Sequence, residues 1–282
     1  MAHITNTGME ITLGDGSTTL VSEGVYELLS TLSNAVKFNP YLPKIFLLAE
    51  GIKSAPPELL AFYSFVISNY KYSHSQIFQD LFVANFFKEK RNGKFLEFGA
   101  CDGKIFSNSF LLESRYQWSG VLAEPCPGWH QELRKNRPNA RIITDCIYKD
   151  TGSKLTFFHS DTEELSTIEQ YIDADALSIP LNASARKKGG KIAEVTSISL
   201  NDVFINYFDS KPIDYMSVDT EGSELSILME FDFDKFHPTV VTVEHNYTDD
   251  EARLDTLFYN HGYTRFLREH TGFDAWYYRD DS

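Results

Sequence analysis

The sequence predicts an α/β protein with a Rossmann-like, mostly parallel sheet. Two stretches support this prediction. Residues 94–98 form an apolar run that passes into Gly99 and Gly103 before an expected helix, which is the pattern of a first strand–turn–helix unit. Glycine is needed there because the backbone turns sharply and lets a nucleotide approach closely. Residues 120–123 form a second short strand that ends in Glu124, where an acid can bind ribose hydroxyls.

The remaining apolar segments continue the alternation of strands and helices. Two runs with alternating polarity, residues 154–159 and 191–197, are expected to pair as edge strands. A late hairpin is expected to insert one antiparallel strand into the sheet. The expected helices are 73–90, 109–116, 128–136, 200–208 and 252–260, and the expected further strands are 140–144, 213–218, 240–243, 263–267 and 275–278.

A chain of 282 residues is expected to hold one large domain with an extension. We predict an N-terminal helical extension over residues 1–72 and the α/β domain over residues 73–282. Within the extension, residues 1–20 are expected to be poorly ordered or to form a loose hairpin. Apolar residues then recur at helical spacing, and four prolines divide the segment into short helices. We expect the extension to pack on the domain, and a cap over a substrate or a dimerisation surface is the alternative.

Composition excludes several classes of protein. The net charge of −14 argues against a nucleic-acid or anionic-membrane surface, since both need a basic face. No run reaches the 18 or so apolar residues of a membrane span, and the N-terminus lacks the form of a signal peptide. Three widely spaced cysteines give no disulfide framework. A cytoplasmic protein is therefore expected, and a homo-oligomer is left open.

Several short motifs stand out along the chain: Ser75-Gln76, Gln79-Asp80, Glu97-Phe-Gly-Ala-Cys-Asp-Gly103, Ser107-Asn108-Ser109, Leu112-Glu113, Trp118-Ser-Gly120, Ala123-Glu124-Pro125 and Ile213-Asp-Tyr-Met-Ser-Val-Asp-Thr-Glu-Gly-Ser-Glu224. Together they resemble the FkbM family of SAM-dependent methyltransferases (SAM, S-adenosylmethionine). The resemblance covers about residues 73–280, and its most specific pieces are the segments 107–108 and 219–222. It implies the Rossmann-like methyltransferase fold, with a mostly parallel seven-stranded sheet and helices on both faces.

The expected cofactor is SAM. An acid two residues before Gly99 suits a ligand with a positive charge near the turn, and SAM carries an ammonium and a sulfonium. A dinucleotide fingerprint would need a third glycine after Gly103, and none follows at the required position. Ser107 and Asn108 could equally be helix caps, and Asp145 could cap a turn. The cofactor-binding residues implied by the turn, the strand ends and the resemblance are Gln76, Glu97, Gly99, Ala100, Asp102, Gly103, Ser107, Asn108, Glu124, Pro125, Asp145, Cys146 and Asp219.

Activation of an acceptor is expected at the ends of the fourth and fifth strands. A hydroxyl must lose its proton during attack, which requires a base that works near neutral pH. His245 is our first choice for that base, with Asp219 and Glu221 as further catalytic residues, although His245 could simply be a hydrogen-bonded histidine. Alternatively, Asp219, Glu244 and His245 hold Mg²⁺ or another divalent cation that acidifies the hydroxyl.

Residues 160–190 form a long polar stretch, which is typical of a lid or a binding loop. The basic run Arg186-Lys187-Lys188 within it would suit an anionic acceptor such as an acidic sugar. A solvated charge run is the alternative.

The function that these observations favour is an O-methyltransferase that acts on a hydroxyl of a sugar or glycan: a polysaccharide, a lipopolysaccharide or a glycoside. The sugar acceptor is implied by the resemblance alone. The alternatives are a methyltransferase for a non-sugar natural-product hydroxyl, an NAD-linked oxidoreductase, and a non-catalytic SAM-binding protein.

Overall fold

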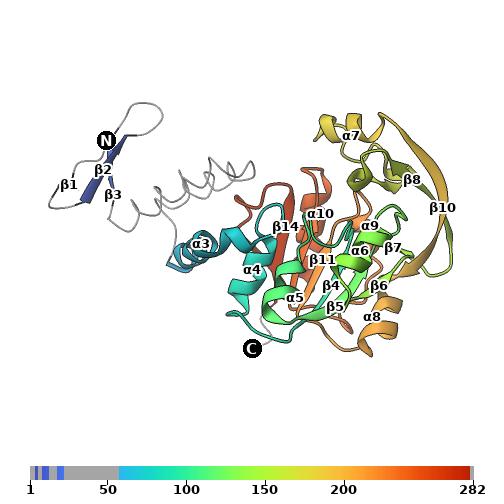
Figure 1. Ribbon diagram of the computed structural model, residues 1–282, viewed down its shortest axis with the longest axis horizontal. Coiled ribbons are helices and arrows are strands. Elements are labelled where there is room, and N and C mark those ends of the chain that lie inside the picture. The colour runs from blue at the N-terminus through green and yellow to red at the C-terminus, as the bar shows by residue number, and fades with distance from the viewer. Residues whose placement is uncertain (1–3, 6–7, 13–17, 22–56, 280–282) are drawn as a thin grey trace. The chain divides into compact units, whose positions relative to one another are not determined.

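The computed structural model describes residues 4–5, 8–12, 18–21 and 57–279 (Figure 1). The chain separates into two compact units, Met1–Lys71 and Tyr72–Ser282. The helices expected over residues 24–56 lie outside the described residues.

The described part of the first unit holds a small antiparallel sheet and one helix. The sheet has the order β1-β2-β3, and the pairing of β2 with β3 matches the hairpin expected near the N-terminus. The bounds are Ile4–Thr5 for β1, Gly8–Thr12 for β2, Thr18–Val21 for β3, Pro57–Asn69 for α3 and Tyr70–Tyr72 for the 3₁₀ turn η2 that follows it.

The second unit is built on a seven-stranded sheet with the order β13-β14-β12-β11-β4-β5-β6. The five strands from β6 to β12 in this order pair in parallel, and β14 pairs antiparallel with both of its neighbours. The predicted Rossmann-like fold and the inserted antiparallel strand are therefore confirmed. The bounds are Lys94–Phe98 for β4, Ser119–Ala123 for β5, Arg141–Ile143 for β6, Tyr215–Val218 for β11, Val240–Glu244 for β12, Thr264–Phe266 for β13 and Asp274–Tyr278 for β14.

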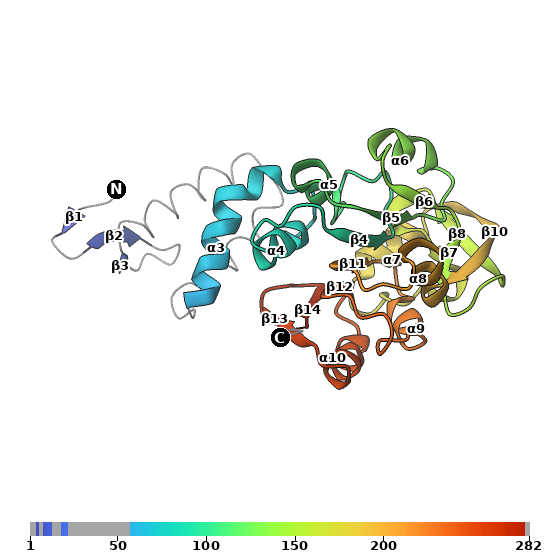
Figure 2. The same ribbon diagram turned by 90° about the horizontal axis from the view of Figure 1, so that it is seen from below.

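Helices cover both faces of this sheet, because the central strands are buried on both sides and must be shielded from water. Helices α4, α5 and α6 lie on one face, and α9 and α10 lie on the other (Figure 2). The bounds are Gln79–Phe86 for α4, Phe110–Tyr116 for α5, His130–Asn136 for α6, Pro180–Arg186 for α7, Leu200–Phe208 for α8, Glu224–Leu228 for α9 and Asp250–Asn260 for α10.

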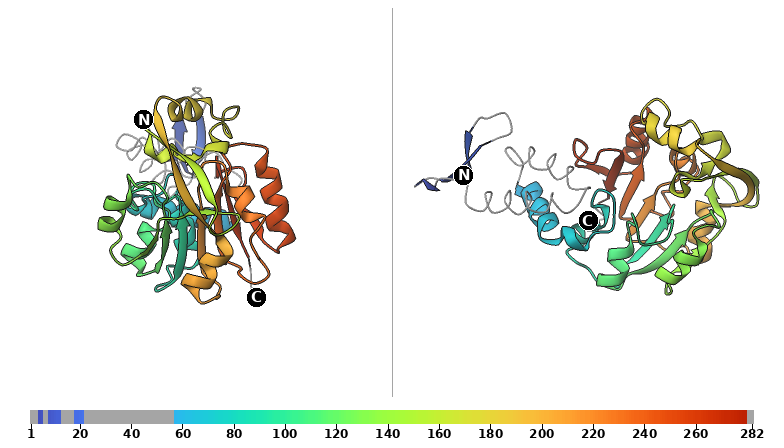
Figure 3. Two further views of the ribbon diagram at one scale, coloured as in Figure 1. Left: turned by 90° about the vertical axis from the view of Figure 1, so that its right-hand side faces the viewer. Right: turned by 45° about the horizontal axis from the view of Figure 1, so that its top comes forward.

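A second, four-stranded sheet has the order β7-β10-β8-β9 and lies with α7 at one end of this unit (Figure 3). The expected pairing of the two strands is confirmed, since β10 runs antiparallel to β8, but they are the central strands of this sheet and not edge strands. Because only β7 and β10 pair in parallel there, the mostly parallel prediction is wrong for this sheet. The bounds are Cys146–Tyr148 for β7, Lys154–Ser160 for β8, Thr167–Ile168 for β9, Gly190–Ser199 for β10, Glu163–Leu165 for the 3₁₀ turn η3 and Glu169–Tyr171 for the 3₁₀ turn η4.

The helix expected from residue 73 begins six residues later, at Gln79. The buried carboxylate of Asp80 accepts hydrogen bonds from the Ser73 hydroxyl (2.6 Å), the His74 amide (2.9 Å) and the Ser75 hydroxyl (2.8 Å). These bonds fold the preceding segment into a turn. Side-chain bonds of this kind compete with the first helical turn, which periodicity alone does not reveal.

Aromatic rings fill much of the space between the sheet and α10. Phe258 is fully buried and stacks on Tyr277 of β14 with ring centroids 4.0 Å apart. Its edges also meet Phe233 and Tyr263.

No helix in the described ranges is both long and apolar enough to cross a membrane.

We expect Phe258→Ala to lower the free energy of unfolding by about 3–5 kcal/mol, because it leaves a cavity between α10 and β14. The next residue, Tyr259, is 78% exposed and provides a matched control. Tyr259→Ala should change the free energy of unfolding by no more than about 0.5 kcal/mol. Urea denaturation followed by circular dichroism measures both, and equal losses would contradict the role given to the aromatic cluster.

Candidate active site

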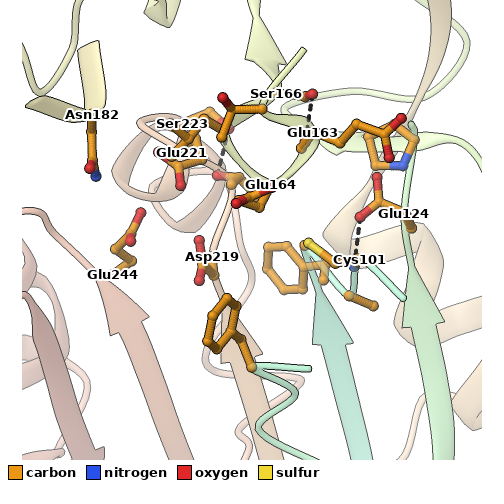
Figure 4. A pocket seen from close by; sticks show the side chains of 18 of the residues that line it. Cys101, Glu124, Glu163, Glu164, Ser166, Asn182, Asp219, Glu221, Ser223 and Glu244 are labelled. Atoms are coloured by element: carbon orange, nitrogen blue, oxygen red, sulfur yellow. Dashed lines mark hydrogen bonds between the residues drawn. The ribbon is translucent and has the colours of Figure 1, made fainter. Parts of the chain in front are cut away.

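A cavity of about 560 Å³ lies in the second unit. It opens at the carboxyl ends of β4, β5, β11 and β12, where open α/β sheets bind their ligands (Figure 4). The insertion between β8 and β10 supplies further walls. Ten predicted site residues line it: Gln76, Gly99, Ala100, Ser107, Glu124, Pro125, Cys146, Asp219, Glu221 and Glu244.

The other predicted site residues do not line this cavity, and two of them have evident structural tasks. The Asp102 carboxylate accepts hydrogen bonds from the amides of Lys104 and Ile105, as a turn cap does. A Cβ added at Gly103 would lie 2.5 Å from Leu133, so this glycine allows close packing on α6 rather than approach of a ligand. The residues outside the lining are Glu97, Asp102, Gly103, Asn108, Asp145 and His245.

Gly99 directly follows β4 and packs closely against the residue that follows the neighbouring strand β11. Its φ is +79°, in the left-handed region that favours glycine. A Cβ at this position would lie 1.8 Å from the backbone oxygen of Asp219. The glycine therefore brings the turn against Asp219, which is the reason a cofactor-binding loop and an acidic residue share one cavity wall.

Glu97 lies behind the cavity wall rather than in it. Its buried carboxylate accepts hydrogen bonds from the Ser107 hydroxyl (2.9 Å), the Asn108 amide (2.7 Å) and the Ser109 hydroxyl. Nη1 of Arg137, the residue directly after α6, lies 3.8 Å from Oε2 of Glu97. Burial raises the pKa of Glu97, and Arg137 and the hydrogen bonds offset part of that rise. Glu97 therefore shapes the loop that lines the cavity, and the predicted direct contact with the cofactor is not favoured.

Glu124 is held by the backbone at the end of β5 and faces the cavity (Figure 4). One carboxylate oxygen accepts from the Cys101 amide at 2.9 Å, and the other accepts from the Cys126 amide at 2.7 Å. Burial nevertheless raises the pKa of Glu124 to about 7. This fixed acid could accept hydrogen bonds from both hydroxyls of a ribose. Cys146 and Ile147 of β7 supply apolar surface nearby in the lining.

Asp219, Glu221 and Glu244 converge on the other side of the cavity. One oxygen from each lies within 4.8 Å of the others. Burial, and then the neighbouring carboxylates, raise the pKa values of Asp219 and Glu244 well above the ordinary range. Burial raises the pKa of Glu221 to about 8, and Arg186 opposes this rise. The three acids therefore share protons near neutral pH, so a member of the cluster can act as a base or hold a divalent cation.

His245 does not line the cavity that this cluster faces. Its side chain is 1% exposed, its Nδ1 accepts a hydrogen bond from the Tyr247 amide at 3.1 Å, and its Nε2 lies 4.0 Å from Glu251. Burial lowers the pKa of His245. This geometry does not favour His245 as the base or as a metal ligand with Asp219 and Glu244.

Residues of the insertion complete the cavity, and sequence patterns did not single them out. Glu163 and Glu164 of η3 and Asn182 of α7 face inward (Figure 4). Their only signal is their position in a long polar segment. Spacing cannot show which of its side chains turn toward the sheet.

The basic run in the insertion has a different task from the predicted one. Arg186 is fully buried and binds Asp175 at 2.7 Å and Glu221 at 2.6 Å, and it also donates to the carbonyl of Leu165. Lys187 pairs with Asp173 at the surface. Neither side chain lines the cavity, so the geometry does not favour the expected binding of an anionic acceptor by this run.

The fold and cavity define a class of protein: an α/β enzyme that binds a nucleotide-containing cofactor at the carboxyl ends of its strands. Residues 97–272 match the model of the methyltransferase FkbM domain, and the chain belongs to this family of SAM-dependent methyltransferases. The predicted family is thereby confirmed. None of the curated proteins matches the chain in sequence.

Solved structures of methyltransferases are among those to which this chain is similar. A precorrin-6y C5,15-methyltransferase from Geobacter metallireducens is 10% identical, with 71% of this chain and 87% of that chain covered and a TM-score of 0.37. A TehB-like SAM-dependent methyltransferase from Corynebacterium glutamicum is 8% identical, with 72% and 89% covered and a TM-score of 0.37. Fibrillarin from Aeropyrum pernix, solved with bound S-adenosyl-L-methionine, is 9% identical, with 99% and 97% covered and a TM-score of 0.36.

We expect the affinity for S-adenosylhomocysteine to fall about tenfold between pH 8 and pH 6. The pKa of Glu124 is about 7, and only the ionised carboxylate accepts from both ribose hydroxyls. Glu124→Gln should bind more weakly at pH 8 and lose this pH dependence. Calorimetric titration measures both effects, with Glu132→Gln on the exposed side of α6 as the control. A wild-type pH profile in Glu124→Gln would remove the assigned role.

Proposed function

We propose that the protein transfers the methyl group of SAM to a hydroxyl of a sugar or glycan. The observation that carries this proposal is the continuity of one cavity from Glu124, at the expected ribose end, to the cluster of Asp219, Glu221 and Glu244. A site for the cofactor alone would not need the acidic cluster in addition to Glu124. Polar side chains of the insertion that line the cavity, such as Asn182 and Ser166, suit an acceptor with several hydroxyls. The three cysteines are unpaired, which fits a reducing compartment such as the cytoplasm.

The acidic cluster supplies the base in this proposal. When bound, SAM supplies an electrophilic methyl group, and its sulfonium becomes a neutral thioether as the S–CH₃ bond breaks and the O–CH₃ bond forms. The acceptor hydroxyl gives its proton to a carboxylate of the cluster. Asp219 is the proposed acceptor of that proton, because it lies against the Gly99 turn and its raised pKa makes it a stronger base than an ordinary carboxylate.

A divalent cation is the second candidate for activating the hydroxyl. The specific observation in its favour is the spacing of Asp219, Glu221 and Glu244, whose oxygens all lie within 4.8 Å of one another. Carboxylate oxygens are ligands that Mg²⁺ accepts, and a bound cation would lower the pKa of the hydroxyl. His245 is no part of this ligand set.

The first test is calorimetric titration of the full chain with S-adenosylhomocysteine and with NAD. We expect S-adenosylhomocysteine to bind with a dissociation constant on the order of micromolar, and NAD to give no heat of binding. The titration is repeated with Mg²⁺ and with EDTA. Binding of NAD without binding of S-adenosylhomocysteine would overturn the proposal in favour of an oxidoreductase.

The second test locates the base. Methyl transfer from labelled SAM to a panel of glycans, glycosides and non-sugar hydroxyl compounds is followed for the wild type, Asp219→Asn and His245→Ala. We expect Asp219→Asn to lower kcat at least 100-fold, in the range of a lost general base, while S-adenosylhomocysteine affinity falls less than about tenfold. His245→Ala should keep most of the activity. The opposite pattern, with activity lost only in His245→Ala, would make the histidine the base. No turnover of any acceptor by the wild type would favour a non-catalytic binding protein.

A further inference from the structure

The end of the cavity that lies away from Glu124 is acidic. Asp219, Glu221 and Glu244 line it from the strand ends, and Glu164 faces it from the insertion (Figure 4). Among the described residues that form the lining there is no lysine, arginine or histidine. A ligand at this end therefore meets carboxylates on two sides.

The nearest cations do not neutralise this end. Arg186 faces Glu221, but it is shared with Asp175, so one positive charge serves two carboxylates. Asp219 and Glu244 form no ion pair with a basic side chain within the described part of the chain. No basic side chain of the described residues therefore competes with a ligand for Asp219 and Glu244.

Among the residues that the structure describes, Glu244 is the acid at this end that has a buried oxygen without a hydrogen-bond donor. Its side chain is more than nine-tenths buried, and it is directed into the cavity beside Asp219 (Figure 4). Its Oε2 is buried and finds no hydrogen-bond partner among the described residues. An acceptor oxygen in that state is costly, and a bound donor relieves the cost. A charged N–H donor would do so most strongly.

The charges of the cofactor do not account for all of these acids. SAM carries an ammonium, a sulfonium and a carboxylate, so its net charge is a single positive one. Glu124 is set apart at the other end by its two backbone hydrogen bonds. The single net positive charge of SAM could balance one of the four remaining acids, Asp219, Glu221, Glu244 and Glu164, when they are ionised, but not all of them.

We propose that this end of the cavity recognises a protonated amine on the acceptor, so that the substrate class is an amino sugar or a related amino alcohol. The inference rests on the proposed function and names its substrate. The ammonium lies among Glu244, Asp219 and Glu221, and a hydroxyl of the same molecule faces the methyl group. An acidic sugar would bring a further negative charge into this end.

The experiment uses the full chain and starts with S-adenosylhomocysteine, whose failure to bind would count against the proposed function itself. The protein saturated with this product is then titrated, with EDTA present, with glucosamine, glucose and glucuronate. These three sugars are similar in size and differ in charge. We expect glucosamine to bind at least tenfold more tightly than glucose, and glucuronate to bind most weakly.

Two variants test the location. Glu244→Gln should reduce the preference for glucosamine over glucose to less than threefold, while its affinity for S-adenosylhomocysteine stays within threefold of the wild type. Glu230→Gln, on the exposed surface after α9, should keep the full preference. Equal binding or no binding of the three sugars would overturn the inference with the cofactor site intact. A preference that survives in Glu244→Gln, or a sugar that binds only when Mg²⁺ replaces EDTA, would overturn it too.

Discussion

The carboxylate of Glu97 sits inside the protein and holds the loop between β4 and α5 in place. Three donors from residues 107–109 converge on it, and Arg137 approaches from α6. A buried carboxylate without these partners would be very unfavourable, so the loop adopts the one path that supplies them. The Asn108 side chain also donates to Ser217 of β11. This wall of the cavity thus depends on a polar network that lies mostly behind its surface.

A second charged network sets the opposite wall. Arg186 crosses from the insertion to Glu221, and Thr167 donates to the Glu221 carbonyl at 3.0 Å. These contacts bring the insertion against the loop after β11. The positions of Asp219 and Glu244 follow from the sheet itself, because their strands are adjacent and parallel. The cavity therefore lies where the edge of the sheet meets an insertion that is held in place by these contacts.

Much of the fold could be predicted from the sequence, because its signals are local. The apolar run before Gly99 and the strand before Glu124 can each be recognised from their apolar residues and from the residues that end them. The parallel centre of the sheet follows from these strands. The same holds for Asp219, which follows a buried strand. Signals that depend on distant partners could not be read. The turn around Asp80 and the burial of Arg186 are examples.

His245 shows most clearly which features of the site the sequence does not predict. It follows β12 directly, so its position in the sequence matches that of a catalytic residue at a strand end. Side chains alternate along a strand, however, and the one that enters the cavity is Glu244, with Asn246 beside it. The amide of Tyr247 then holds the imidazole on the far side. Which of the residues at the end of β12 directs its side chain into the cavity depends on the local backbone conformation. The amino-acid composition does not reveal that conformation.

The antiparallel ladder between β8 and β10 closes the insertion at its base, from Ser160 opposite Gly190 to Lys154 opposite Thr196. The segment between residues 160 and 190 is connected to the rest of the chain through that ladder. Its length and side chains can therefore change without altering the register of the main sheet. Over evolutionary time, such a module can drift in length and side chains while the half that holds the cofactor stays constant. Selection for a new acceptor would act first on this module, with Arg186 and Glu221 as the contact through which its changes reach the strand ends.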